Sequence, residues 1–381
     1  MTDVHGHRES AVERAAEPER GAIGFAERVI ALLDEGTFTA TYKFALLLAL
    51  LDSCLESTSA TGAPPQWLTT ADLARRVTEL YWPQTRPYVG LAGAAILRQN
   101  AGGQAEIIRA IRRFREQHAP DPSTPLSEAR AGAPRQFARL LETVEWKLVE
   151  MPLPRLQVMG GVCDPFIYRI AWTTDVKRPE TRAPDFDARV HFVGHAAEYL
   201  VQLSGLLRPL IEAKWTSRIL RFNQQVVSDA HLPEFLFGAE RVSLAAVRPL
   251  LRDIQRGCCF YCGGQLRTVA DVDHFVPWAR WPDNGIENLV AAHPSCNGSK
   301  RDYLAATSHL AGWLRRFDGS TEIGRAVHDA ATVLQWDTHP ERTLSVARAI
   351  YLRVPESARL WVARDAFEPV DHRRLAALLA S

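Results

Sequence analysis

The chain has 381 residues, a length that favours two or three domains over one. With 46% hydrophobic and 23% charged residues the composition is globular, and no run of 18 apolar residues is present to span a membrane. The net charge of +1 argues against a protein that coats nucleic acid over its whole surface.

The first 21 residues are polar and charged, and we expect them to be disordered. They lack the apolar core of a signal peptide. Most of the six cysteines gather between residues 258 and 296, which does not resemble a disulfide framework. We therefore expect a cytoplasmic protein with no membrane association.

Residues 22–117 are expected to form a helical N-terminal domain, because apolar residues recur at three and four spacing over 21–35, 41–56, 69–82 and 104–117. This arrangement is similar to a helix-turn-helix or winged-helix domain, and a plain helical bundle is the alternative. In the first case Arg75, Arg76 or the helix that carries Arg112 and Arg113 would contact DNA. Thr69 and Asp72 form an N-cap pattern.

The remaining organisation is also mainly α-helical. Residues 118–135 are rich in Pro, Ala and Ser and are expected to form a linker. Residues 136–256 form a mixed region, with short strands and irregular structure in 136–185 and helices over 197–214 and 244–255. A C-terminal helical region is expected over 307–381, with helices at 307–316, 321–335, 340–351 and 372–379.

Two pairs of soft metal ligands enclose residues 259–296. Cys259 and Cys262 are separated by two residues, and so are His293 and Cys296. Two such pairs bind zinc in tetrahedral geometry. Four protein ligands leave no coordination position open for water or substrate, so we expect a structural Zn²⁺. Cys258 is the rival for the first position, and ordinary buried thiols are the alternative interpretation.

A second group of polar residues lies between these pairs. Residues 268–278 alternate and are rich in Val and Phe, which predicts a strand carrying Asp273 and His274. Adjacent side chains on a strand point to opposite faces, so a twist or bulge is needed to bring both to one phosphate. A neutral histidine can accept the proton of a water, and a carboxylate can hold a divalent cation.

The order of these motifs resembles the HNH endonuclease family. Residues 271–277, Asp-Val-Asp-His-Phe-Val-Pro, are similar to the HNH domain of RNA-guided CRISPR nucleases, and Asn288 and Asn297 match the later motif positions. The resemblance implies a ββα-metal fold over residues 257–306, here called the finger, embedded in a mainly α-helical protein. It implies that His274 is the general base, that Asp273 and Asn297 bind Mg²⁺, Mn²⁺ or a similar ion, and that Asn288 braces the loop.

Side chains around the motif add three expectations. A helix is expected over residues 295–306, and Lys300 on it would contact a phosphate or the leaving group. Trp278 is expected to fill the core of the finger. For Trp281 two roles remain, packing in the core or contact with a nucleic-acid base.

These expectations combine into a metal-dependent endonuclease that hydrolyses DNA, with RNA as a further substrate class. We expect it to act in restriction or phage defence, with a homodimer or a defence-system protein as its partner. A single finger cuts one strand, so double-strand cleavage would require a dimer or two independent nicks. A partner- or ligand-gated effector or toxin nuclease is one alternative. A catalytically silent, zinc-stabilised nucleic-acid-binding module is the other.

Overall fold

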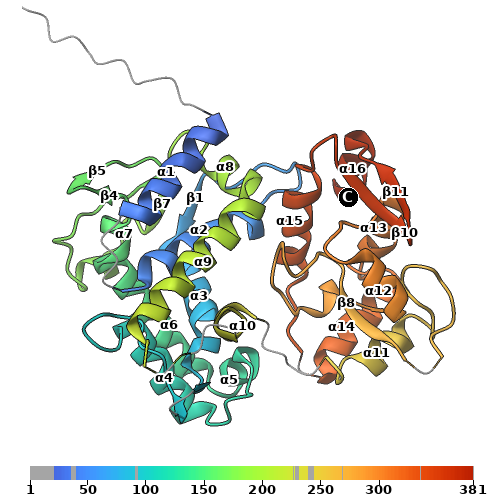
Figure 1. Ribbon diagram of the computed structural model, residues 1–381, viewed down its shortest axis with the longest axis horizontal. Coiled ribbons are helices and arrows are strands. Elements are labelled where there is room, and N and C mark those ends of the chain that lie inside the picture. Colours follow the sequence, from blue (N-terminus) through green and yellow to red (C-terminus); the bar gives the residue numbers. More distant parts are fainter. Residues whose placement is uncertain are drawn as a thin grey trace, which may run out of the picture.

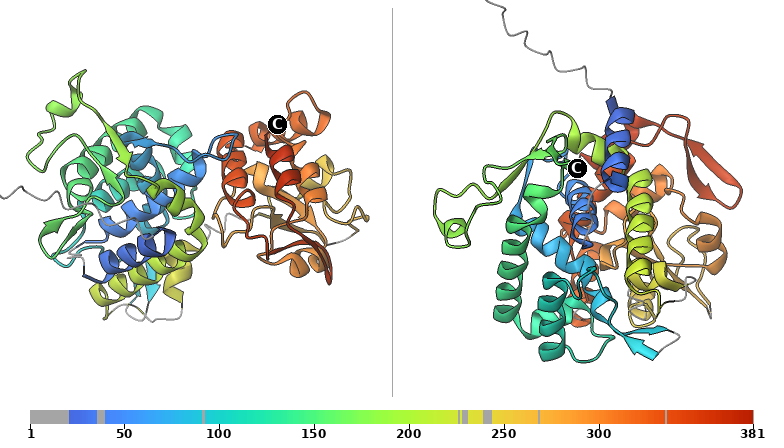
Figure 2. Two further views of the ribbon diagram at one scale, coloured as in Figure 1. Left: turned by 90° about the horizontal axis from the view of Figure 1, so that it is seen from above. Right: turned by 60° about the vertical axis from the view of Figure 1, so that its left-hand side comes forward.

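The computed structural model describes residues 21–35, 40–90, 93–225, 227, 231–238, 244–267, 269–334 and 336–380. The segment expected to be disordered lies outside these residues except for Gly21. The described chain forms two lobes (Figure 1), which Figure 2 shows from two further sides. Among the described helices, none combines the length and apolar character that a membrane span requires.

The N-terminal lobe is helical, as expected. Its helices are α1 (Gly21–Glu35), α2 (Tyr42–Glu56), α3 (Thr70–Tyr81), α4 (Glu106–His118), α5 (Leu126–Gly132), α6 (Pro134–Glu150), α7 (Pro152–Arg155), α8 (Ala196–Gln202), α9 (Ser204–Phe222) and α10 (Leu232–Phe237). The N-cap pattern is confirmed, because Thr69 Oγ1 accepts from the Asp72 N–H at 3.0 Å and Asp72 Oδ2 accepts from the Thr69 N–H at 3.3 Å.

Short strands connect these helices. β1 (Trp67–Thr69), β7 (Arg189–Phe192) and β6 (Tyr168–Arg169) form an antiparallel sheet in the order β1-β7-β6, and β2 (Tyr88–Gly90) pairs with β3 (Gly93–Ala95) and β4 (Val158–Met159) with β5 (Val162–Cys163). The expected strands of residues 136–185 are therefore present.

Helix α6 was not expected from the sequence. It occupies residues 134–150, where the sequence analysis placed irregular structure, and buries Phe137, Leu140, Val144 and Leu148 at three and four spacing. The segment expected as a linker, residues 118–135, carries α5, which contacts both α4 and α6. These residues therefore join helices within one lobe.

The C-terminal lobe contains the finger. Its elements are α11 (Arg248–Ile254), β8 (Asp271–His274), the 3₁₀ turn η4 (Ile286–Asn288), β9 (Leu289–Ala292), α12 (Pro294–Lys300), α13 (Thr307–Leu314), α14 (Glu322–Leu334), α15 (Pro340–Tyr351), β10 (Arg359–Ala363), β11 (Ala366–Pro369) and α16 (His372–Leu379). β8 and β9 pair antiparallel, with Asp273 opposite Val290 and His274 opposite Leu289. With α12 they form the expected ββα unit.

Two finger elements are shorter than the sequence predicts. β8 spans four residues of the expected 268–278, and Thr268 lies outside the described residues. The helix expected over 295–306 ends at Lys300, where Arg301 takes a φ of 48°. Ala305 instead forms a bridge to Trp361 of β10, so tertiary pairing replaces the last turn.

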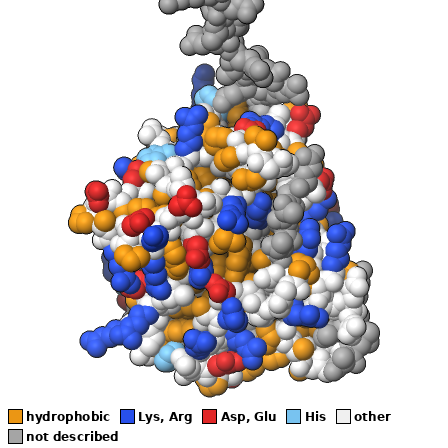
Figure 3. Space-filling view, turned by 90° about the vertical axis from the view of Figure 1, so that its left-hand side faces the viewer, with side chains coloured by type: hydrophobic (Ala, Val, Ile, Leu, Met, Phe, Trp, Pro, Cys, Tyr) orange, Lys and Arg blue, Asp and Glu red, His pale blue; other side chains and the backbone are white. Residues whose placement is uncertain are grey.

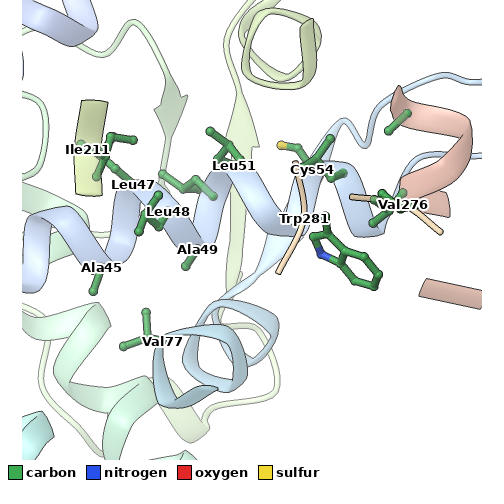
Figure 4. Packing of buried hydrophobic residues seen from close by; sticks show 14 of the residues in the cluster. Ala45, Leu47, Leu48, Ala49, Leu51, Cys54, Val77, Ile211, Val276 and Trp281 are labelled. Atoms are coloured by element: carbon green, nitrogen blue, oxygen red, sulfur yellow. The ribbon is translucent and has the colours of Figure 1, made fainter. Parts of the chain in front are cut away.

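Helix α2 is the central element of the molecule. Its residues from Phe44 onward are buried, and Figure 4 shows its side chains packed toward Val77 of α3 and Ile211 of α9. At its C-terminal end, Cys54 lies near Val276 and Trp281 of the finger. Trp281 is fully buried, and its Nε1–H donates to Glu56 Oε1 at 3.3 Å. The loop after β8 therefore packs against the N-terminal lobe.

Buried charges reinforce this lobe contact. Arg76 donates to Asp52 Oδ2 through Nε at 2.8 Å and Nη2 at 2.6 Å, and its Nη1 lies 2.8 Å from Glu79 Oε2. Arg342 of α15 lies 3.1 Å from Glu79 Oε2 and 3.0 Å from Glu56 Oε1. The expectation that Arg76 reads DNA is wrong, because Arg76 is 5% exposed and is paired with Asp52 and Glu79 inside the N-terminal lobe. Arg342 is the residue that connects this cluster to the C-terminal lobe.

Asp283, in the same loop as Trp281, carries a pH-dependent part of the stability. Burial raises its pKa to about 7, although the charge of Arg342 opposes the shift. Because this value exceeds the unfolded value of about 3.9, the associated stability is present in acid and is lost as pH rises through about 7. We expect Asp283→Asn to raise the free energy of unfolding on the order of 2–4 kcal/mol at pH 8, with a smaller gain at pH 5.

Urea denaturation at both pH values measures this difference. The asparagine Oδ1 can still accept the hydrogen bond that the Gly285 N–H donates to Asp283 at 2.9 Å. A gain that shrinks from pH 5 to pH 8 would contradict the assignment.

Candidate functional site

Four soft donors meet at one end of the finger. The ligand atoms of Cys259, Cys262, His293 and Cys296 lie within 4.8 Å of one another. The first pair stands on a turn after α11, and the second pair stands at the start of α12. The predicted clustering is confirmed, with Cys259 and not Cys258 as its first member.

The turn that presents the first pair depends on glycine. Gly263 has a φ of 68°, a left-handed conformation that glycine adopts without steric cost. Its N–H donates to the Cys259 carbonyl at 2.9 Å, and the Cys259 N–H donates to the Gly264 carbonyl at 2.8 Å. These bonds direct both sulfur atoms to the same side.

His293 is held in the tautomer that a metal ligand needs. Its Nε2 lies 3.1 Å from the Gln265 carbonyl oxygen, which can only accept, so Nε2 carries the proton. The unprotonated Nδ1 then faces Cys262 Sγ at 3.3 Å. A carbonyl that fixes the second ring nitrogen is the usual support of a metal-binding histidine.

The crowded sulfur atoms fit a bound cation. Burial and the charge of Cys259 raise the pKa of Cys296 to about 12, because adjacent thiolates repel each other. A cation removes this penalty, and three thiolates with one imidazole are a common ligand set of tetrahedral zinc. The residues therefore fit a structural metal such as zinc.

The hard ligands lie on the face of β8 that meets α12. Asn297 Nδ2 donates to Asp271 Oδ2 at 3.1 Å. Asp273, two residues further along the same face, accepts a hydrogen bond from the Tyr261 hydroxyl and pairs with Lys300 Nζ at 3.1 Å. Carboxylate and amide oxygens suit Mg²⁺ or Mn²⁺, so this donor set fits a divalent cation.

Lys300 has a different role from the one expected. Its side chain is fully buried, and Nζ also donates to the His274 carbonyl oxygen at 2.9 Å. A contact between Lys300 and a phosphate is incompatible with this burial, so that expectation is wrong. The lysine instead ties α12 to the end of β8, where it balances the charge of Asp273.

His274 points to the other face of β8, toward the loop that follows. Its Nε2 lies 2.9 Å from Asn284 Oδ1, an acceptor, so Nε2 carries the proton and Nδ1 is the basic nitrogen. Burial lowers the pKa of His274, although the Asn284 hydrogen bond and the charge of Asp273 oppose the shift. The imidazole is therefore neutral at pH 7 and able to accept a proton.

A comparison with protein families decides what this arrangement is. Residues 259–306 match the HNH endonuclease family. The match covers the four soft ligands and both faces of β8, and it ends where the finger ends. No curated protein and no solved structure matches the chain. The remaining residues therefore carry no assignment from relatives.

Asn288 of the HNH finger connects the two ends of the loop. Its Nδ2 donates to the carbonyl oxygens of Val276 at 3.2 Å and Asp283 at 3.4 Å, and its Oδ1 accepts from the Val276 N–H at 2.8 Å. This geometry is that of a bracing residue, which is the role the family resemblance implies for it.

The structure does not bring every expected residue to the HNH finger. Arg112 and Arg113 are exposed on α4, which lies at the far side of the N-terminal lobe from α12 (Figure 1). Arg112 pairs with Glu116 at 2.7 Å. Figure 3 shows the outer face of this lobe, where basic side chains are scattered among acidic and apolar ones. A nucleic-acid contact there stays a prediction.

Three residues of the site were missed in the sequence. Asp271 was given no role of its own in the sequence analysis, although its spacing of two from Asp273 places both on one strand face. Tyr261 and Asn284 lie outside the strand that carries the motif, and their roles depend on tertiary contacts. Asn284 is the side chain that orients His274.

The hydrogen bond from Asn284 gives a test of this orientation. We expect Asn284→Ala to slow single-turnover cleavage roughly 10- to 100-fold. Removing a residue that orients a functional side chain typically lowers activity by this factor. The rate is measured at saturating protein concentration, so that a change in substrate affinity does not enter the comparison. Asn284→Asp, which keeps an acceptor oxygen, should recover part of the rate; equal rates in wild type and Asn284→Ala would refute the role.

Proposed function

We propose that the protein is a metal-dependent endonuclease that hydrolyses phosphodiester bonds in DNA. The observation that supports it most is the position of His274, a neutral imidazole held by Asn284 at the end of the strand that carries Asp271 and Asp273, with Asn297 of α12 against that strand. A base close to a set of oxygen ligands is what phosphodiester hydrolysis requires.

In this proposal His274 Nδ1 accepts the proton of the attacking water, and Asn284 holds the ring while the charge develops. Asp273 and Asn297, with Asp271 beside them, would hold Mg²⁺ or Mn²⁺. The bound cation would supply charge neutralisation on the phosphoryl oxygens and on the leaving 3′-oxygen. The ion pair with Lys300 holds Asp273 in place. The products carry 5′-phosphate and 3′-hydroxyl ends.

A zinc ion at the four soft ligands would have no part in the reaction. With Cys259, Cys262, His293 and Cys296 all bound, no position would be left for water or substrate. Cys259 and Cys262 would hold the ion from the turn after α11, and His293 and Cys296 would hold it from the start of α12. This link would fix the position of Asn297, one residue beyond Cys296.

The biological part of the proposal is a cytoplasmic nuclease of restriction or phage defence. A single finger cuts one strand, so double-strand cleavage needs a homodimer, a partner protein or two separate nicks. A ligand- or partner-gated effector is the second candidate. It is favoured by the packing of Trp281 against α2. Through this contact, a movement of the N-terminal lobe would shift the loop that holds His274.

A plasmid assay tests the central claim. Supercoiled DNA is incubated with the purified protein and Mg²⁺, Mn²⁺ or EDTA, and a structured RNA is treated in parallel. We expect metal-dependent conversion to the nicked form, with little cleavage of RNA and none in EDTA. Cleavage that persists in EDTA would reject the mechanism, and preferential cleavage of RNA would change the substrate class.

A further inference from the structure

A cavity of about 190 Å³ lies between the two lobes, where α5 and α10 face the C-terminal lobe (Figure 1). One water needs about 10–15 Å³ of such space, so the cavity has room for a small molecule. Leu80, Leu126 and Phe237 line it from the N-terminal lobe, and Trp278 and Asn284 line it from the finger. All five side chains are half-buried and present part of their surface to the cavity.

The charged lining is balanced. Four arginines and four carboxylates contribute to the cavity, among them Arg76, Arg208 and Asp283, which are buried. A site of this kind does not favour a simple anion or cation. It offers hydrogen-bond donors and acceptors side by side, next to the apolar and aromatic surfaces of Phe237 and Trp278. A planar ring with donors and acceptors along its edges complements both features.

The cavity adjoins the proposed catalytic base. Asn284, which lines it, accepts the hydrogen bond of His274 Nε2 at 2.9 Å. Trp278, which also lines it, has its ring centroid 5.1 Å from that of His274. A molecule in the cavity therefore contacts the residues that surround His274, on the side opposite to the basic Nδ1.

We propose that this interlobe cavity binds a nucleobase. Phe237 and Trp278 would contact the faces of the ring, and the buried arginines and Asp283 would meet its edges. The base could come from the substrate, as a nucleotide rotated out of the stack beside the scissile phosphate, or from a free nucleotide. The first source rests on the proposed nuclease function, whereas the second does not.

Binding measurements in EDTA test the proposal without cleavage. In the first arm, the melting temperature is recorded with each of the four common nucleoside monophosphates. In the second arm, oligonucleotides that carry 2-aminopurine are added and the fluorescence is followed. A free-nucleotide site predicts a rise in melting temperature of about 2 °C at tenfold excess over Kd. An extruded base predicts that the 2-aminopurine fluorescence changes on binding, because the base exchanges its neighbours in the DNA stack for Phe237 and Trp278.

Variants assign either signal to the cavity. Ser127→Trp places an indole in the cavity from α5, and Phe237→Ala removes one wall; both should lose the signal. Val333→Trp, at a position that is 77% exposed on α14, is the matched control and should keep it. Circular dichroism and metal content verify that each variant is folded.

The outcomes separate the two proposals. A signal from nucleotides or from 2-aminopurine that both cavity variants lose supports the site and identifies its source. No signal from either ligand with the wild type overturns it, as does a signal that Ser127→Trp and Phe237→Ala retain. Plasmid nicking by the same preparation reports separately on the nuclease function.

Discussion

The His274→Ala variant is expected to nick supercoiled DNA about 10²- to 10⁴-fold more slowly than the wild type, the range that general-base catalysis contributes. The side chain contacts Asn284 and Trp278 and is half-buried, so its removal should leave the fold and the metal content intact. The loss should appear in the rate of the single-turnover reaction, whereas the affinity for DNA, measured in EDTA, should stay the same.

His328→Ala is the matched control, because His328 is an exposed histidine on α14 in the same lobe. It should cleave at the wild-type rate. If His274→Ala retained full activity while folded and metal-loaded, His274 would not be the base. The proposed mechanism would then fail even if the protein proved to be a nuclease.

Loss of the zinc cluster is expected to have the largest structural effect. Replacing Cys262 with alanine should reduce the zinc content from about one per chain to near zero. Structural zinc contributes roughly 10–16 kcal/mol of binding energy in small zinc modules, so the finger should lose its fold and the protein its activity. Metal analysis and thermal denaturation measure both consequences.

Cys258→Ala is the control for that experiment. Cys258 is adjacent to Cys259, and its Sγ lies 3.4 Å from Gln265 Nε2, in a contact separate from the four-ligand cluster. This variant should keep its zinc and its melting temperature. If Cys258→Ala lost zinc and Cys262→Ala retained it, the assignment of ligands would be wrong.

The parts of the site that depend on short spacing could be predicted from the sequence. The two Cys/His pairs fix their own geometry, because two intervening residues form one turn, and this separated Cys259 from Cys258. The resemblance to the HNH family implied that Asn288 braces the loop, and the hydrogen bonds of Asn288 to Val276 and Asp283 have that geometry.

The parts that depend on distant contacts could not be predicted. Lys300 has the sequence context of an exposed charge, and only the packing of α12 on β8 shows that it is buried with Asp273. The two tryptophans depend on distant contacts in the same way. Trp278, which was expected in the core, is half-buried beside His274. The role of Trp281 was left open, and the structure buries it against α2, more than 200 residues away in the chain.

The pairing between Ala305 and Trp361 has a consequence for any attempt to isolate the finger. The Trp361 N–H donates to the Leu304 carbonyl at 2.8 Å, and the Ala306 N–H donates to the Trp361 carbonyl at 2.7 Å. Phe275, next to His274, stacks on Trp313 at 4.5 Å. A fragment of residues 257–306 would lack both partners. The finger therefore depends on packing against residues that follow it in the chain, and an excised finger would expose apolar surface that is buried here.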